Sequence, residues 1–155
     1  MEINWLGYNY WWERAADGVI ISINKESLHI FFDTNFLMAL GQFARFNLTF
    51  ELDRVLPGQR VCVVLSPIIG ELEKLLNEGS SKVRKEAQIA LTYAKNNCQM
   101  WPVDYTHKNV DFILLHYAQE YKGIVATNDR LLKKIARKKG IKTLFIRNQS
   151  YLMMQ

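Results

Sequence analysis

Four acidic residues stand where a carboxylate could do chemistry: Asp33, Glu71, Asp111 and Asp129. Each follows a strand-like segment or falls in the first turns of an expected helix. The carboxyl ends of parallel strands converge on one edge of an α/β sheet, and ligands bind there. Four carboxylates at such an edge would repel one another unless a cation lay between them. The pattern therefore indicates a Mg²⁺- or Mn²⁺-dependent phosphodiesterase, because these ions prefer hard oxygen ligands.

Each carboxylate also has a purely structural explanation. Asp33 could cap a helix, and Asp129 could cap the turn that it forms with the two residues before it. The helix dipole favours Asp111 in a first turn, and Glu71 could sit at a rim with its head in water. None of these explanations requires the four residues to share one edge, so we interpret them jointly as a metal site.

Helical spacing predicts different environments for Glu71 and the nearby Glu73. Ile68 and Leu75 lie three positions before and four positions after Glu71, so Glu71 should border the inward apolar stripe. Glu73 lies about 200° around the helix and should face solvent.

Polar residues beside the acids could support them. Asn35 adds an amide near Asp33, while Thr127 and Asn128 could orient a ligand or a water molecule. The histidines have no zinc spacing and are expected to be structural or surface residues: His29, His107 and His116.

The elements that must position these residues alternate from Leu28 onward. We expect strands at 28–32, 61–65, 99–103 (a short edge strand), 123–127 and 142–147, the last being the final strand. We expect helices at about 36–46, 47–56, 67–77, 80–96, 109–121 and 129–139. This order predicts an α/β fold with a parallel sheet covered on both faces.

The first 27 residues differ from the rest, so we divide the chain into an extension at 1–27 and a main domain at 28–155. The extension is rich in Trp and Tyr, and we expect an antiparallel β-hairpin that turns near Asp17-Gly18. Its aromatic side chains could stack on bases, or pack within the hairpin or across a dimer interface. Replacing Trp11 and Trp12 would discriminate between these roles.

The composition suggests a cytoplasmic protein. The longest apolar runs are too short to span a bilayer, and the N-terminus has no basic segment of the kind that begins a secretory signal. Cys62 and Cys98 match no metal spacing, and we expect Cys62 to be a reduced thiol in the core, with no disulfide.

Basic residues concentrate near the C-terminus. Nine lie between Lys122 and Arg147, where Asp129 is the only acid. Such a surface suggests a polyanionic partner, although a solvated helix face would look the same.

Four segments resemble, in order, the acidic motifs of PIN-domain nucleases: 31–38, 68–74, 109–114 and 124–133. The resemblance is closest to archaeal members similar to the branch that processes small-subunit ribosomal RNA, and VapC-type toxins share the fold. It implies a three-layer α/β/α sandwich with a central parallel sheet, and metal-dependent cleavage of RNA. By motif, Asp33, Glu71, Asp111 and Asp129 would be the catalytic and metal-binding acids, with Thr127 and Asn35 in support. Phe112 follows Asp111, where we expect an acidic or small polar residue in many members.

We therefore expect an endoribonuclease that uses one or two Mg²⁺ or Mn²⁺ ions. Its RNA backbone would be guided past the acids by Arg130, Lys133 and Lys134. Its role would be ribosomal RNA maturation, or that of a toxin inhibited by a separate antitoxin, and the family makes a homodimer plausible. The alternative is a non-catalytic scaffold that binds RNA or protein. A phosphatase or receiver-like α/β protein is disfavoured, because Asp33 lacks the second aspartate two positions on that a haloacid-dehalogenase-type phosphatase uses. The sequence has no GxGxxG motif and no P-loop, so a nucleotide cofactor is unsupported.

Overall fold

The computed structural model describes residues 27–104 and 109–155. The expected aromatic hairpin and His107 therefore lie outside the described residues. No helix in the described part of the chain is both long and apolar enough to cross a membrane.

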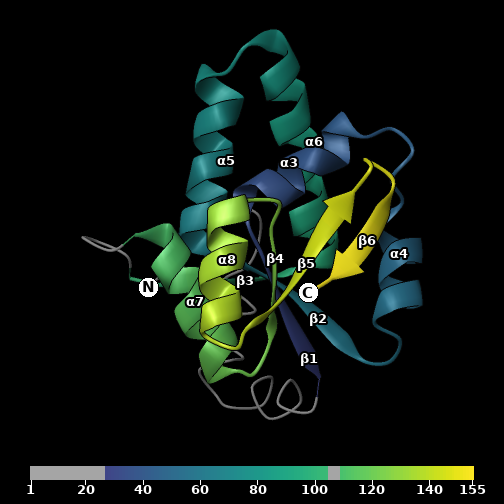
Figure 1. Ribbon diagram of the computed structural model, residues 1–155. Helices are drawn as coiled ribbons and strands as arrows, with labels where there is room; N and C mark the ends of the chain where they lie inside the picture. The colour runs from purple at the N-terminus through teal and green to yellow at the C-terminus, as the bar shows by residue number, and fades with distance from the viewer. Residues whose placement is uncertain (1–26, 105–108) are drawn as a thin grey trace.

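A six-stranded sheet forms the centre of the molecule (Figure 1). In chain order, its strands are β1 (Leu28–Phe32), β2 (Arg60–Leu65), β3 (Gln99–Trp101), β4 (Ile124–Ala126), β5 (Lys142–Arg147) and β6 (Tyr151–Met154). Their order across the sheet is β3-β2-β1-β4-β5-β6, and the first five strands run parallel. The chain winds outward in one direction from β1 and in the other from β4. The point between β1 and β4 is therefore the topological switch point, where α/β proteins bind ligands.

The helices are α3 (Thr34–Gln42), α4 (Leu48–Val55), α5 (Ser66–Glu78), α6 (Ser81–Asn97), α7 (Val110–Glu120) and α8 (Arg130–Lys138). Asn47, Ser80 and Asn109 accept hydrogen bonds from the first turns of α4, α6 and α7, which explains where these helices begin. In Figure 1, α5 and α6 form a teal hairpin that extends beyond the sheet, and the two helices pack against each other.

Two neighbouring residues of β1 show that helices cover both faces of the sheet. The ring of Phe31 contacts Tyr117 of α7 and Tyr121, the residue that follows this helix. The ring of Phe32 points to the opposite face and contacts Phe36 of α3 and Tyr93 of α6. Both β1 rings are fully buried. The predicted three-layer α/β/α sandwich is confirmed.

The expectation that 142–147 is the final strand was wrong. β6 follows and pairs with β5 in the antiparallel sense, with Arg147 opposite Tyr151. Asn148 and Gln149 make the turn possible with φ values of 52° and 57°. The sequence shows no glycine here, and glutamine is an uncommon residue at positive φ, so the usual hairpin signal is missing.

The expectation of a reduced Cys62 in the core was also wrong. Cys62 and Cys98 form a disulfide, with their Cα atoms 4.6 Å apart. The cause is the register of two parallel strands, because Val63 of β2 pairs with Gln99 of β3 and so places the preceding cysteines side by side. Cys62 is half-buried, whereas Cys98 is buried. Sequence spacing alone could not reveal this register.

Candidate metal-binding edge

Asp33 lies at the switch point, where β1 ends and α3 begins. Its main-chain N–H donates a hydrogen bond of 2.9 Å to the carbonyl oxygen of Ala126, which holds the ends of β1 and β4 together. Its carboxylate is buried and accepts hydrogen bonds from the Thr34 N–H at 2.8 Å and from the Thr127 hydroxyl at 2.7 Å. Asp33 is thus both the N-cap of α3 and a fixed acceptor at the ligand-binding edge.

The pKa of Asp33 reflects these surroundings. Burial raises the pKa to about 6, since water no longer stabilises the charged form. The hydrogen bonds from Thr127 and Thr34 oppose the rise, while the charges of Asp111 and Glu71 add to it. An ionised Asp33 therefore costs free energy here, and a nearby cation would offset that cost.

The segment after β4 completes this part of the edge. The buried Thr127 hydroxyl accepts a hydrogen bond of 3.1 Å from the Asp129 N–H while it donates to Asp33. The side-chain oxygen of Asn35 accepts from the Asn128 N–H at 3.1 Å. The three residues expected to support the acids thus connect the end of β1 to the end of β4.

Glu71 joins the edge through Thr34, the residue after Asp33. The Thr34 hydroxyl donates a hydrogen bond of 2.6 Å to Glu71 Oε1. Thr34 was not among the residues expected to support the acids. The available signal was a hydroxyl at the first position of α3, directly after the central carboxylate.

The expected exposures of Glu71 and Glu73 were wrong. Glu71 is exposed and Glu73 is half-buried. Ile68, Ile69 and Leu72 are buried on α5, so the inward stripe is centred near Leu72. The two glutamates flank Leu72 and therefore each lie about 100° from that centre, on opposite sides. Glu71 lies on the side of Thr34 and Asp33.

Asp111 and Asp129 lie at the starts of α7 and α8. The Asp129 carboxylate caps α8 by accepting a hydrogen bond of 2.9 Å from the Leu132 N–H. The Asp111 N–H donates a hydrogen bond of 2.8 Å to the side chain of Asn109, which caps α7. Burial, and then the charge of Asp129, raise the pKa of Asp111. The negative charge of Asp129 thus disfavours ionisation of Asp111.

None of the four acids forms an ion pair with another described residue. Within residues 27–104 and 109–155, no three acidic, histidine or cysteine side chains converge into a compact metal site. The carboxylates therefore surround the edge without meeting at one point. The donor set nonetheless suits Mg²⁺ or Mn²⁺, because it consists of carboxylate oxygens with neighbouring threonine and asparagine oxygens.

A basic surface begins at this edge and continues along α8. Arg130 directly follows Asp129, and Lys134 lies one turn further on; both are exposed. Lys133 differs, because its Nζ lies 3.8 Å from the centroid of the Phe145 ring and the side chain is half-buried. The cations expected to guide RNA thus include two free side chains and one that packs on the protein.

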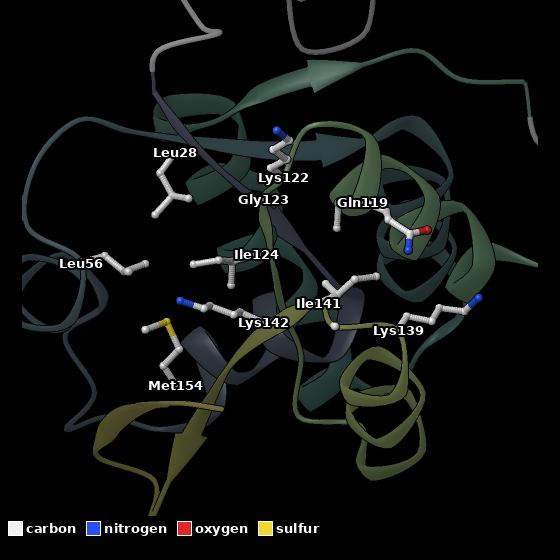
Figure 2. Close-up of a pocket in the computed structure, with 12 residues that line it drawn as sticks. Leu28, Leu56, Gln119, Lys122, Gly123, Ile124, Lys139, Ile141, Lys142 and Met154 are labelled. Atoms are coloured by element: carbon white, nitrogen blue, oxygen red, sulfur yellow. The ribbon is translucent and has the colours of Figure 1, made fainter.

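A hollow of about 370 Å³ lies at the opposite edge of the sheet (Figure 2). Leu28, Ile124 and Lys142, which begin β1, β4 and β5, line it together with Lys122 and Lys139. None of the four acids lines this hollow. Its place at the amino ends of the strands separates it from the acidic edge.

A family model described as a PIN like domain matches residues 30–149. The chain belongs to the PIN-like domain family. The match contains all four acidic motifs, so the resemblance drawn from the sequence is confirmed.

Known proteins agree with this assignment. The PIN-like domain is 36% identical over 121 residues to Ribonuclease VapC4 of Methanocaldococcus jannaschii, covering 77% of this chain and 90% of that protein. It is also similar to the solved structure of the PIN domain endonuclease Utp24, with a TM-score of 0.61 and 27% identity over 82% of this chain and 90% of that one. A domain of a functionally unknown protein from M. jannaschii shares the fold, with a TM-score of 0.54 and 17% identity over 78% of this chain and 92% of that one.

Proposed function

We propose that this PIN-like domain is an endoribonuclease that hydrolyses RNA phosphodiester bonds with Mg²⁺ or Mn²⁺ held by Asp33, Glu71, Asp111 and Asp129. The observation that carries the proposal is the buried Asp33 carboxylate, whose pKa is raised at an edge bordered by other carboxylates. Similarity to a ribonuclease and to an endonuclease supports the same reaction.

The chain's own residues would orient the acids and bind the RNA. Thr127 and Thr34 hold the carboxylates of Asp33 and Glu71 by hydrogen bonds of 2.7 Å and 2.6 Å, and so reduce their freedom to rotate. Exposed Arg130 and Lys134 would bind phosphates beside the acids. The cation, when bound, would activate water and offset the charge that develops on the scissile phosphate.

Two biological roles are compatible with this reaction. One is maturation of ribosomal RNA, and the other is that of a toxin restrained by a separate antitoxin. Growth arrest on expression, relieved by a neighbouring antitoxin gene, would favour the toxin.

The test is cleavage of end-labelled single-stranded and structured RNAs in Mn²⁺, in Mg²⁺ and in EDTA. We expect metal-dependent cleavage by the wild type and none by Asp33→Asn or Glu71→Gln. Glu73→Gln is the matched control, because Glu73 lies on the same helix but on the other side of Leu72, and it should retain activity. Equal cleavage by the wild type and Asp33→Asn would refute the proposal. A folded wild type that binds RNA without cutting it would instead support the scaffold alternative.

A further inference from the structure

The hollow at the amino ends of the strands combines apolar walls with lysines (Figure 2). The lysines are all exposed: Lys122, Lys139 and Lys142. The apolar residues come from four strands and two connecting segments: Leu28, Leu56, Gly123, Ile124, Ile141 and Met154. At about 370 Å³, the hollow falls within the usual size range of ligand-binding pockets.

The three lysines have no acidic partner in the described part of the chain. Within residues 27–104 and 109–155 none of them forms an ion pair, and no Asp or Glu is among the described residues that line the hollow. Lys122 and Lys139 lie just beyond the C-terminal ends of α7 and α8, where each helix dipole places about half a negative elementary charge. Lys142 begins β5, so no helix end explains it. Three full positive charges exceed the two half charges, and the hollow therefore attracts anions.

The directions of the lysines limit the kind of anion. In Figure 2 the ammonium group of Lys142 points between Ile124 and Met154, whereas those of Lys122 and Lys139 point in other directions. A single phosphate or carboxylate could not contact all three groups. A ligand with several separated negative charges could contact them together, so the hollow fits an extended polyanion.

The apolar walls distinguish between the two common polyanions, which are RNA and an acidic peptide. An RNA base would stack on an aromatic ring or an arginine, and neither is among the described residues that line the hollow. Phosphates bound to the lysines would leave the apolar walls in water. An aliphatic side chain would cover them, and it would also cover Met154, which is 38% exposed. The walls therefore favour a peptide.

We infer that the hollow binds an acidic segment of a partner protein. An aliphatic side chain of that segment enters the hollow, and the Asp or Glu residues beside it bind Lys122, Lys139 and Lys142. The inference does not depend on the proposed reaction, because none of the four acids lines the hollow. A partner bound at the amino ends of the strands leaves the acidic edge, at their carboxyl ends, open to substrate.

The test is a selection of peptides from a random display library on the immobilised full chain. We expect the enriched peptides to carry Asp or Glu on both sides of an aliphatic residue. Binding of one such peptide, labelled with fluorescein, would then be measured by anisotropy. Lys142→Glu should weaken binding by about tenfold or more, because a like charge replaces the cation. Met154→Gln keeps the length of the side chain but removes apolar surface, and it should also weaken binding.

The matched control is Lys134→Glu, which makes the same charge change on the exposed face of α8 and should have little effect on peptide binding. Lys142 and Met154 are exposed, so their variants should keep the melting temperature of the wild type. Cleavage of RNA by Lys142→Glu should also match the wild type. Loss of peptide binding is thus distinguishable from failure of the proposed reaction.

Four outcomes would overturn the inference. The first is a selection that enriches no acidic peptide. The second is an equal loss of peptide binding in Lys142→Glu and Lys134→Glu, which would indicate general attraction to a basic surface. The third is displacement of the peptide by single-stranded RNA, with Lys142→Glu weakening RNA binding as strongly as peptide binding; the hollow would then be an RNA site. The fourth is a wild type that sediments as a dimer and a Lys142→Glu variant that sediments as a monomer, which would assign the hollow to a contact between two copies of this chain.

Discussion

The Thr127 hydroxyl donates a hydrogen bond of 2.7 Å to Asp33, although 94 positions separate the two residues. The same hydroxyl accepts a hydrogen bond from the Asp129 N–H. One buried oxygen thus fixes the position of two segments that carry acids, at the point where β1 and β4 end. This relationship makes Thr127 a positioning residue whose removal would disturb the site without removing a carboxylate.

Replacing Thr127 with valine should preserve the shape of the side chain and remove the hydroxyl. Asp33 would lose a buried hydrogen bond and the Asp129 N–H would lose its acceptor, so we expect destabilisation of about 1–3 kcal/mol. Cleavage should fall by about 10- to 100-fold, as is typical when a residue that orients a metal ligand is lost. Thr127→Ser keeps the hydroxyl and should retain most of the activity. If valine and serine behaved alike, the hydroxyl would have no positioning role.

The raised pKa of Asp33 predicts how stability depends on pH in the absence of metal. Folding raises the pKa from 3.8 to about 6, so between these values the folded protein holds a proton that the unfolded chain has released. The free energy of unfolding should therefore fall as pH rises through this window and level off above it. The shift of about two units corresponds to a cost of about 3 kcal/mol.

Asp33→Asn should recover much of this cost, since its amide carries no charge. In EDTA at pH 8 the variant should melt at a higher temperature than the wild type, and the difference should shrink towards pH 4. Adding Mn²⁺ at pH 8 should raise the melting temperature of the wild type and have little effect on the variant. Thermal melts across this pH range check both points, and a pH-independent difference would show that Asp33 is not the titrating group.

The acidic edge could be predicted because the residues next to each acid in the sequence indicate where a strand ends or a helix begins. Asp33 and Asp129 each follow a buried apolar run and precede a helix, and parallel strands bring such positions together at one edge. Thr127 was named because it opens the turn after β4. These assignments need only the direction of the strands, which the alternation of strands and helices already indicates.

The remaining features depend on contacts that the sequence does not mark. The hydrogen bond from Thr34 to Glu71 follows from how α3 and α5 pack. The disulfide follows from the register between β2 and β3, because a shift of one residue would separate Cys62 from Cys98. The strand β6 needs the positive φ of Gln149, a conformation that glutamine adopts only when the surrounding structure holds it.

Lys134 and Lys133 should contribute to RNA binding in different ways. Lys134 is exposed, so Lys134→Ala should weaken binding similarly for all sequences and reduce the salt slope by about one. Lys133 packs on Phe145, and burial, followed by the charges of Arg130 and Arg147, lowers its pKa. Lys133→Ala should therefore cost about 0.5–2 kcal/mol of stability and change the salt slope less. Affinity titrations at several salt concentrations, with thermal melts, check this; equal salt slopes for the two variants would contradict it.

Reduction of the Cys62–Cys98 disulfide should loosen the edge strand β3. The bond joins residues 36 positions apart. A closed loop of this length restricts the unfolded chain, so reduction should lower the free energy of unfolding by about 3–4 kcal/mol. A strong reductant should lower the melting temperature of the wild type, while Cys62→Ser should melt at that lower temperature with or without the reductant. A thiol titration of the native protein should find no free thiol at these two positions before reduction and two afterwards. Two reactive thiols in the unreduced protein, with no effect of the reductant on melting, would show that the bond does not form.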